Sequence, residues 1–351
     1  MSGFEVTIEE EIADVTLGRP HVLLLGAGAS KAALPHGDKH GRPVPLLKEV
    51  ADQLKLVDYF PVDLTALSVQ DFEAAYSRLH ERGPSAELAA INAQVAEAFS
   101  QLELPDEPNL YDVINLSLRD KDVVATFNWD PFLLQSRLRL ARLGLSTSFP
   151  QLFFLHGNVL AGFCETDSVS GMLGRRCSTC GRQFAPSKLL YPVEKKNYQS
   201  DPFIKREWEA VRYFLEECSM FTVFGYSAPV TDQEAVSLLK NGWGDTDQRE
   251  MEQTEVIDRP GADHDALRAT WQPFIHTHHY DIFDNFYDSF IANHPRRSIE
   301  AYWQQYFEAK FITNNPVPPR FLSFAEMGDW FRPLLEVEKH RAEESKSSER
   351  H

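Results

Sequence analysis

The sequence is poor in cysteine, with four residues in a chain of 351. That number is too small for a disulfide scaffold at this length, so the fold must depend on a hydrophobic core. Hydrophobic residues make up 43% of the chain and aromatic residues 12%, which is enough for one large domain or for a domain with an elaboration. We therefore expect a globular protein with a large buried core.

Basic residues and long apolar runs are also scarce. Lys and Arg total 35 against 52 Asp and Glu, which gives a formal net charge of −17. Because there is no basic surplus to neutralise phosphates, we expect no direct binding to nucleic acid or to an anionic membrane. No apolar run approaches the ~18 residues of a membrane-spanning helix, and the first residues lack the basic and apolar regions of a signal peptide. The expected location is the cytoplasm.

Several short apolar runs predict a buried sheet. Residues 22–25 form an aliphatic run that stops in a glycine-rich turn, GAGAS, at residues 26–30. A run without polar alternation predicts a strand buried on both faces. Further strands, separated by helical patterns, are predicted at residues 122–127, 152–155, 221–224 and 255–258. The expected fold class is therefore α/β, with a Rossmann-like parallel sheet covered by helices on both faces.

Polar residues and glycines follow these predicted strands. Asn128 and His156 come after the second and third strands, and Gly26 and Gly225 begin the turns after the first and fourth. In a parallel sheet these positions meet at one edge, where ligands bind. Glycine turns let backbone N–H groups approach a phosphate, and an amide with an imidazole can orient a hydroxyl and accept a proton. The pattern predicts a nucleotide-type site; alternatively, the glycines serve packing, Asn128 caps a helix and His156 is a core histidine.

The motifs resemble those of the sirtuin superfamily and occur in the same order. They are GAGAS at residues 26–30, TFNWD at 126–130, LHG at 155–157, a cysteine-bearing insert at 164–180 and GYS at 225–227. The resemblance covers roughly residues 20–260 and implies a domain that binds NAD, with a smaller helical module and a zinc-binding insert. It implies that the pyrophosphate and adjoining ribose are held by Gly26, Ala27, Gly28, Ser30, Gly225 and Ser227.

The resemblance also implies roles at the reacting end of NAD. Asn128 would bind the nicotinamide ribose or position a water, Asp130 would hold the nicotinamide carboxamide, and His156 would be the general base. Thr126 belongs to the same cofactor-binding motif. The acidic Asp258, after the last predicted strand, is a candidate for a ribose hydroxyl contact.

Two departures favour water over acyl-lysine as the nucleophile. Deacylating sirtuins have glutamine before the asparagine, where this chain has Phe127, and a phenylalanine-glycine-glutamate segment, where it reads LLYPVEKKNY at residues 189–198. The chain thus looks more like the bacterial sirtuin-like NAD hydrolases of antiphage defence, which release nicotinamide and ADP-ribose. The alternatives are a protein deacylase or ADP-ribosyltransferase, and a non-catalytic subunit that binds NAD or ADP-ribose.

An NAD hydrolase without restraint would kill its host, so the resemblance implies control by assembly or by a trigger. We expect a homo-oligomer, with a HerA-type ATPase or another defence protein as a candidate partner. The predicted organisation is an N-terminal edge segment (1–20), the catalytic domain (21–260), a C-terminal helical extension (261–335) and a disordered tail (336–351). Within the catalytic domain we expect a helical module at 46–110 and the cysteine-bearing insert at 160–190.

The insert contains a candidate metal site. Cys164, Cys177 and Cys180 lie at the position of the family's zinc module. A closed structural zinc site needs four ligands, and only three cysteines are local. Asp167, three residues after Cys164, is the candidate fourth ligand. The alternative is a hairpin with free thiols.

Overall fold

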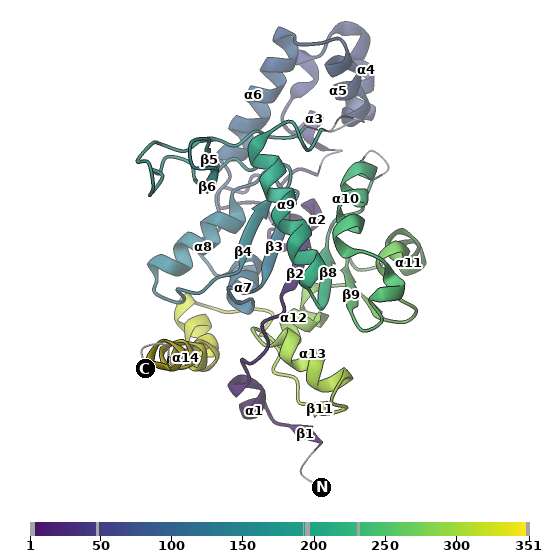
Figure 1. The fold of residues 1–351 in the computed structure, drawn as a ribbon. Helices are drawn as coiled ribbons and strands as arrows, with labels where there is room; N and C mark the ends of the chain where they lie inside the picture. The colour runs from purple at the N-terminus through teal and green to yellow at the C-terminus, as the bar shows by residue number, and fades with distance from the viewer. Residues whose placement is uncertain (1–3, 47–48, 192, 194–196, 230–231, 349–351) are drawn as a thin grey trace.

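The computed structural model describes residues 4–46, 49–191, 193, 197–229 and 232–348 (Figure 1). Its centre is a parallel sheet in the order β10-β9-β8-β2-β3-β4. The strands are β2 (His21–Leu25), β3 (Val123–Thr126), β4 (Gln151–Phe154), β8 (Met220–Phe224), β9 (Gln253–Ile257) and β10 (Tyr280–Phe283). The expected α/β class is confirmed, and β10 is a strand beyond the five predicted. No helix within the described ranges is long and apolar enough to cross a membrane.

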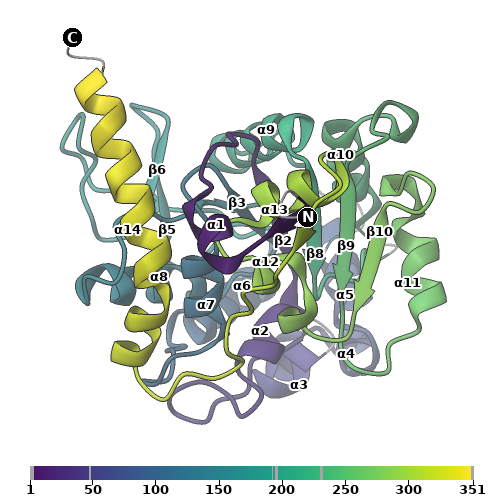
Figure 2. The same ribbon diagram turned by 90° about the horizontal axis from the view of Figure 1, so that it is seen from below.

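The central strand β2 is buried on both faces, as its aliphatic run predicts. Leu23 and Leu25 belong to one hydrophobic cluster, and Val22 and Leu24 belong to another. The first cluster includes side chains of α2 (Ala27–Ala33) and α7 (Leu110–Ser117), and the second includes those of α9 (Pro202–Glu217) and α10 (Gln233–Trp243). Figure 2 shows these two layers of helices on opposite faces of the sheet. Successive side chains of a strand point to opposite faces, so one short run serves both cores.

A group of helices follows the first βα unit. It contains α3 (Val50–Gln53), α4 (Val62–Gln70), α5 (Phe72–Glu81) and α6 (Ala86–Ser100), within the range expected for a helical module. Asp71 and Ser85 cap α5 and α6, because their side chains accept hydrogen bonds from the amides of Ala74 and Leu88. The group stands beyond the carboxyl-terminal edge of the sheet, at the top of Figure 1.

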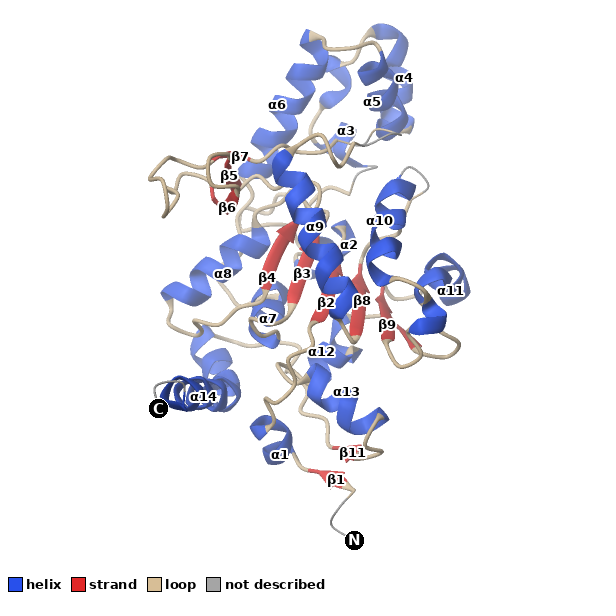
Figure 3. Ribbon diagram, viewed as in Figure 1, coloured by secondary structure: helices blue, strands red, loops and turns tan. Residues whose placement is uncertain are grey.

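Two short sheets lie outside the main one. The cysteine-bearing insert forms an antiparallel sheet of β5 (Ala161–Cys164), β6 (Val169–Met172) and β7 (Ala185–Pro186), set apart from the main sheet in Figure 3. Near the N-terminus, β1 (Glu5–Val6) pairs in parallel with β11 (Phe311–Ile312), and α1 (Ile8–Ala13) follows β1.

The C-terminal extension is only partly helical. It contains α11 (His264–Trp271), α12 (Phe290–Asn293) and α13 (Ser298–Tyr306), but it also contributes β10 and β11. The strand β10 pairs along its whole length with β9 and extends the main sheet. The extension therefore completes the sheet of the catalytic domain instead of forming a separate helical layer.

The predicted disordered tail is helical over residues 336–348. The helix α14 spans Phe324–Ser348, while residues 349–351 lie outside the described part. The Glu338 side chain on this helix accepts hydrogen bonds from the fully buried guanidinium groups of Arg296 and Arg297, at 2.7 Å from each. A charged, serine-rich composition predicts disorder, but it does not reveal that one carboxylate pairs with two buried arginines elsewhere in the chain.

Candidate functional site

The strand order reverses between β2 and β8, so the turns after these strands meet. The Gly26 amide donates to the Phe224 carbonyl at 2.9 Å, and the Gly28 amide donates to the Gly225 carbonyl at 3.0 Å. A methyl group on Gly225 would lie 2.3 Å from the Ala29 nitrogen. These glycines therefore serve close packing of the two turns. The Ala27 amide makes no hydrogen bond within the described part of the chain, so its N–H group remains able to donate to a ligand.

Ser30 is the centre of a buried polar network behind this turn. Its hydroxyl donates to Asp130 Oδ2 at 2.7 Å and lies 2.9 Å from Asn128 Nδ2, which donates to it. The Tyr111 hydroxyl lies 2.6 Å from the same Ser30 oxygen. A serine hydroxyl has one proton to give, so Tyr111 must be a donor to Ser30. The family resemblance implies that Ser30 holds the pyrophosphate or the adjoining ribose, and in the structure its side chain contacts Asn128 and Asp130 after β3.

Asn128 and Asp130 are held from several directions. The Asn128 side chain also donates to the Gly26 carbonyl at 2.9 Å, and its backbone amide donates to the Thr126 hydroxyl at 3.0 Å. Burial raises the pKa of the Asp130 carboxyl to about 6, against the opposing effect of the Ser30 hydrogen bond. The network therefore presents an amide and a carboxyl group whose charge changes close to neutral pH.

His156 belongs to a second buried network. Its Nε2 lies 3.0 Å from the Tyr198 hydroxyl, which donates to Asp232 Oδ1 at 2.8 Å. The Tyr226 hydroxyl donates to Asp232 Oδ2 at 2.7 Å. Burial, and next the charge of Asp232, raise the pKa of both tyrosines far above the usual value of 10. Both phenols therefore stay protonated.

The Phe127 ring packs against the second network. Its ring centroid lies 4.6 Å from that of His156 and 4.3 Å from that of Tyr226. The next residue is Asn128, so one turn after β3 supplies both a wall beside the imidazole and the amide of the first network. Asn158 connects the loops, because its side chain donates to the Asp130 carbonyl at 2.6 Å.

A cavity of about 670 Å³ adjoins the loop that bears His156. It lies between α5 and α6 on one side and residues 187–191, 193, 197 and 200 on the other, and the Leu190 amide donates to the His156 carbonyl at 2.9 Å. Residues 192 and 194–196 of the LLYPVEKKNY stretch lie outside the described residues. The lining includes Tyr76, Asn92, Ser187, Leu190, Tyr191 and Asn197.

The remaining predicted cofactor contacts lie at the ends of β8 and β9. Ser227 is exposed in the turn after β8. The Asp258 carboxylate, after β9, accepts a hydrogen bond from the amide of Arg259 at 2.7 Å. Both positions follow parallel strands on the same edge as Gly26 and Asn128, as the sequence pattern requires.

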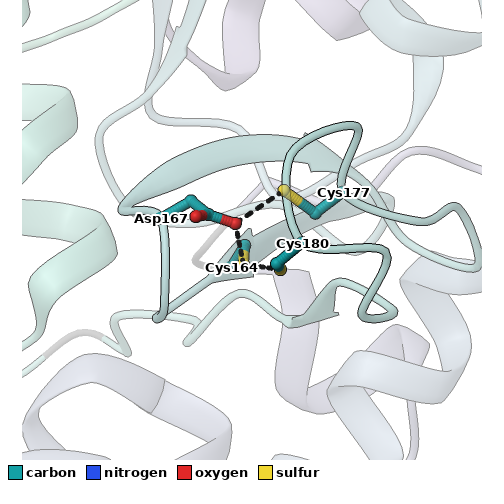
Figure 4. Close-up of side chains that lie close together, drawn as sticks. All are labelled: Cys164, Asp167, Cys177 and Cys180. Atoms are coloured by element: carbon teal, nitrogen blue, oxygen red, sulfur yellow. Dashed lines mark hydrogen bonds between the residues drawn. The ribbon is translucent and has the colours of Figure 1, made fainter.

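The candidate metal ligands come together in the insert (Figure 4). Asp167 Oδ2 lies 3.0 Å from Cys177 Sγ and 3.4 Å from Cys164 Sγ, and the sulfurs of Cys164 and Cys180 are 3.5 Å apart. The four donor atoms lie within 4.8 Å of one another and could hold a metal ion. The hydrogen bond to the Asp167 carboxylate raises the pKa of the Cys180 thiol to about 12, because it favours the protonated thiol. Three soft thiols and one carboxylate suit zinc.

The site residues predicted from the sequence do not include Asp232 or the three tyrosines. Tyr226 belongs to the GYS turn and Asp232 follows it closely, so that motif is the signal for both residues. Tyr111 and Tyr198 carry no comparable signal, because their hydroxyl partners come from segments distant in the sequence. Only the fold brings these groups to His156 and Ser30.

No protein-family model and no curated protein matches the chain. Solved structures do match. One described as a Sir2 homolog–NAD complex has a TM-score of 0.39 at 15% identity, over 84% of this chain and 94% of that one. Another, from work on sirtuin substrate affinity, has a TM-score of 0.37 at 15% identity, over 81% and 94%. Sir2 bound to acetylated peptide gives 0.34 at 14% identity, over 83% and 93%.

All three are sirtuin structures. At TM-scores below 0.5 the likeness carries no weight for the function of this chain, and the ligands named belong to those proteins.

Proposed function

We propose that this chain is a sirtuin-type NAD hydrolase that cleaves NAD to nicotinamide and ADP-ribose. The observation that carries the proposal is the pair of buried networks at neighbouring strand ends, one with Ser30, Asn128 and Asp130 and the other with His156. They lie at the carboxyl edge of a parallel sheet, close to its switch point, where such sheets bind ligands. The order of the sequence motifs supports the same assignment.

The hydrolysis of NAD needs few catalytic groups from the protein. Cleavage of the bond between ribose and nicotinamide passes through an oxocarbenium-like state, as in glycoside hydrolysis, and the leaving nicotinamide already carries positive charge. The protein must orient NAD, stabilise developing charge and select the nucleophile. In this proposal Asn128 orients the ribose or a water, Asp130 holds the carboxamide, and His156 accepts the proton of the attacking water.

Phe127 supports hydrolysis over acyl transfer. Its ring stands beside the His156 imidazole, at the position where deacylating sirtuins carry glutamine. An apolar ring offers no hydrogen bond to a polar acyl group or to a peptide. Water does not need a hydrogen bond from this side chain to enter the site, so water is the nucleophile that an apolar residue at this position favours.

The decisive experiment measures the fate of NAD with purified protein, with and without an acetylated peptide. We expect nicotinamide and ADP-ribose without peptide, and loss of both products in Asn128→Ala and His156→Ala. His264→Ala is the matched control, because His264 is an exposed histidine paired with Asp284. Acetylated ADP-ribose formed only with peptide would instead identify a deacylase, and tight NAD binding without turnover would identify a binding subunit.

We also propose that the hydrolase acts in bacterial antiphage defence and is controlled by assembly, as a homo-oligomer or with a HerA-type ATPase. Exposed aromatic side chains support an interface near the β1–β11 sheet: Phe4, Tyr306, Phe307 and Phe311. Native mass spectrometry should give an oligomer that Phe311→Glu weakens, and NAD loss should follow phage infection of expressing cells. A monomer with full activity would contradict control by self-assembly.

We propose that the insert holds a structural zinc ion, with Cys164, Cys177, Cys180 and Asp167 as ligands. Zinc would tie the β5–β6 hairpin to the turn that bears Cys177 and Cys180, and it takes no part in the reaction. Metal analysis should find one zinc per chain, less in Asp167→Ala, and full content in Asp167→Cys, which restores a fourth thiolate. Freshly purified protein without zinc would refute this site.

A further inference from the structure

The buried carboxylate of Asp232 accepts hydrogen bonds from two tyrosine hydroxyls. Tyr198 donates to one of its oxygens at 2.8 Å, and Tyr226 donates to the other at 2.7 Å. Asp232 is 3% exposed, so these hydrogen bonds replace much of the water that a carboxylate needs. The direction of the two bonds is fixed, because an ionised carboxylate can only accept.

This direction determines what Tyr198 can offer to His156. A tyrosine hydroxyl has one proton, and that of Tyr198 is committed to Asp232. Toward His156 Nε2, 3.0 Å away, the same oxygen can therefore only accept. Nε2 must carry a proton to make this bond. The Asp232 oxygen, 3.9 Å from Nε2, favours the same arrangement because it attracts the positive end of the N–H dipole.

The opposite arrangement is unfavourable on the same distances. If Tyr198 donated to His156, its oxygen would face the Asp232 carboxylate at 2.8 Å with no proton between them. Two oxygen lone pairs at hydrogen-bond distance in a buried site repel each other, and the carboxylate would lose one of its two phenol donors.

We propose that Tyr198 and Asp232 are positioning residues that hold neutral His156 in the tautomer with the proton on Nε2, so that Nδ1 is its basic nitrogen. This inference rests on the proposed NAD hydrolysis. As the ribose–nicotinamide bond breaks, its electron pair leaves with nicotinamide and neutralises the pyridinium ring. The water oxygen forms the new bond to the ribose carbon, and the water proton passes to Nδ1 and then to solvent.

The tautomer can be measured without activity. In protein labelled with ¹⁵N-histidine, the neutral ring of His156, assigned by its loss in His156→Ala, should show a pyrrole-type Nε2 and a pyridine-type Nδ1. Tyr198→Phe removes the acceptor for the Nε2 proton and should give averaged shifts at the two nitrogens. A proton on Nδ1 in the wild type, or an unchanged spectrum in Tyr198→Phe, would overturn the proposal.

Turnover supplies a matched comparison. Tyr226→Phe removes an equivalent hydroxyl from the same carboxylate, and Tyr302→Phe removes a buried hydroxyl bonded to the distant Met251 carbonyl. We expect Tyr198→Phe to lower kcat roughly 10- to 100-fold, Tyr226→Phe to lower it less than about threefold, and Tyr302→Phe to leave it unchanged. Equal losses in the first two variants would mean a structural network only. If the wild type cleaves no NAD, the proposed function fails, while the ¹⁵N spectrum still decides the tautomer.

Discussion

The attachment of α14 by Glu338 gives a prediction that the structure makes quantitative. Arg296 and Arg297 have no exposed side-chain surface, and both donate to Glu338, whose side chain is 12% exposed. Arg297 also donates to the Ile12 carbonyl, so the same cluster reaches the N-terminal segment. Removal of Glu338 leaves two buried guanidinium groups without the carboxylate that they share.

The expected cost is that of breaking a buried ion pair, about 3–5 kcal/mol in the free energy of unfolding. Glu338→Ala should show this full loss. Glu338→Gln keeps an acceptor without the charge, so it should lose less than Glu338→Ala. Glu336→Ala, at an exposed position on the same helix, is the matched control and should change stability by less than about 0.5 kcal/mol.

The effect should also depend on pH with a defined sign. The two arginines hold the pKa of Glu338 below its usual value of 4.5, although burial opposes them. A carboxyl group with a lowered folded-state pKa stabilises the fold above its unfolded pKa, and it loses that contribution as the pH falls through the folded one. The difference between wild type and Glu338→Ala should therefore be full at pH 7 and shrink below about pH 4.

Urea denaturation followed by circular dichroism measures these differences, and hydrogen exchange of the α14 amides shows whether the loss is local. We expect faster exchange over residues 336–348 in Glu338→Ala and unchanged exchange in Glu336→Ala. Equal stability of Glu338→Ala and wild type would refute the role of Glu338 in attaching α14. It would favour a disordered tail, as the composition suggests.

Three further predictions concern the core and the site. Gly225→Ala adds a methyl group 2.3 Å from the Ala29 nitrogen at a φ of +66°, so it should lower the free energy of unfolding by more than about 3 kcal/mol in urea denaturation. Gly174→Ala is the control, because its φ is +80° but the added methyl group meets open space, and it should cost only about 1 kcal/mol. Burial raises the pKa of Glu255 to about 7, so its ionisation should cost stability as the pH rises from 4.5 to 7, and Glu255→Gln should flatten that slope in denaturation curves at several pH values. Ser30→Ala removes the centre of the first network and should weaken ADP-ribose binding at least tenfold by calorimetry, with Ser237→Ala, exposed on α10, as the unaffected control.

Five of the six strands of the central sheet could be predicted, because most of them are largely apolar. Residues 22–25 and 152–155 are apolar runs, residues 122–127 and 221–224 are mostly apolar, and the structure places strands there with few differences at their ends. The positions of Asn128 and His156 follow from the same reasoning, because a residue after a parallel strand lies at the ligand-binding edge whatever its partners are.

The hydrogen bonds of the site could not be predicted in the same way. The Ser30 hydroxyl contacts side chains from the segment after β3 and from α7, and His156 contacts a tyrosine that follows the insert. The strand β10 and the last turns of α14 were missed for a related reason. Their stability comes from β9 and from two buried arginines, which a local pattern does not contain.

The central position of β2 has a consequence for synthesis of the chain. One edge of β2 pairs with β3, but the other pairs with β8, and residues 26–219 are made between β2 and β8. At a translation rate of about 5–20 residues per second, this edge waits roughly 10 to 40 s for its partner. An unpaired apolar edge is a template for aggregation, so the nascent chain should depend on chaperones most strongly in the interval before Phe224 leaves the ribosome.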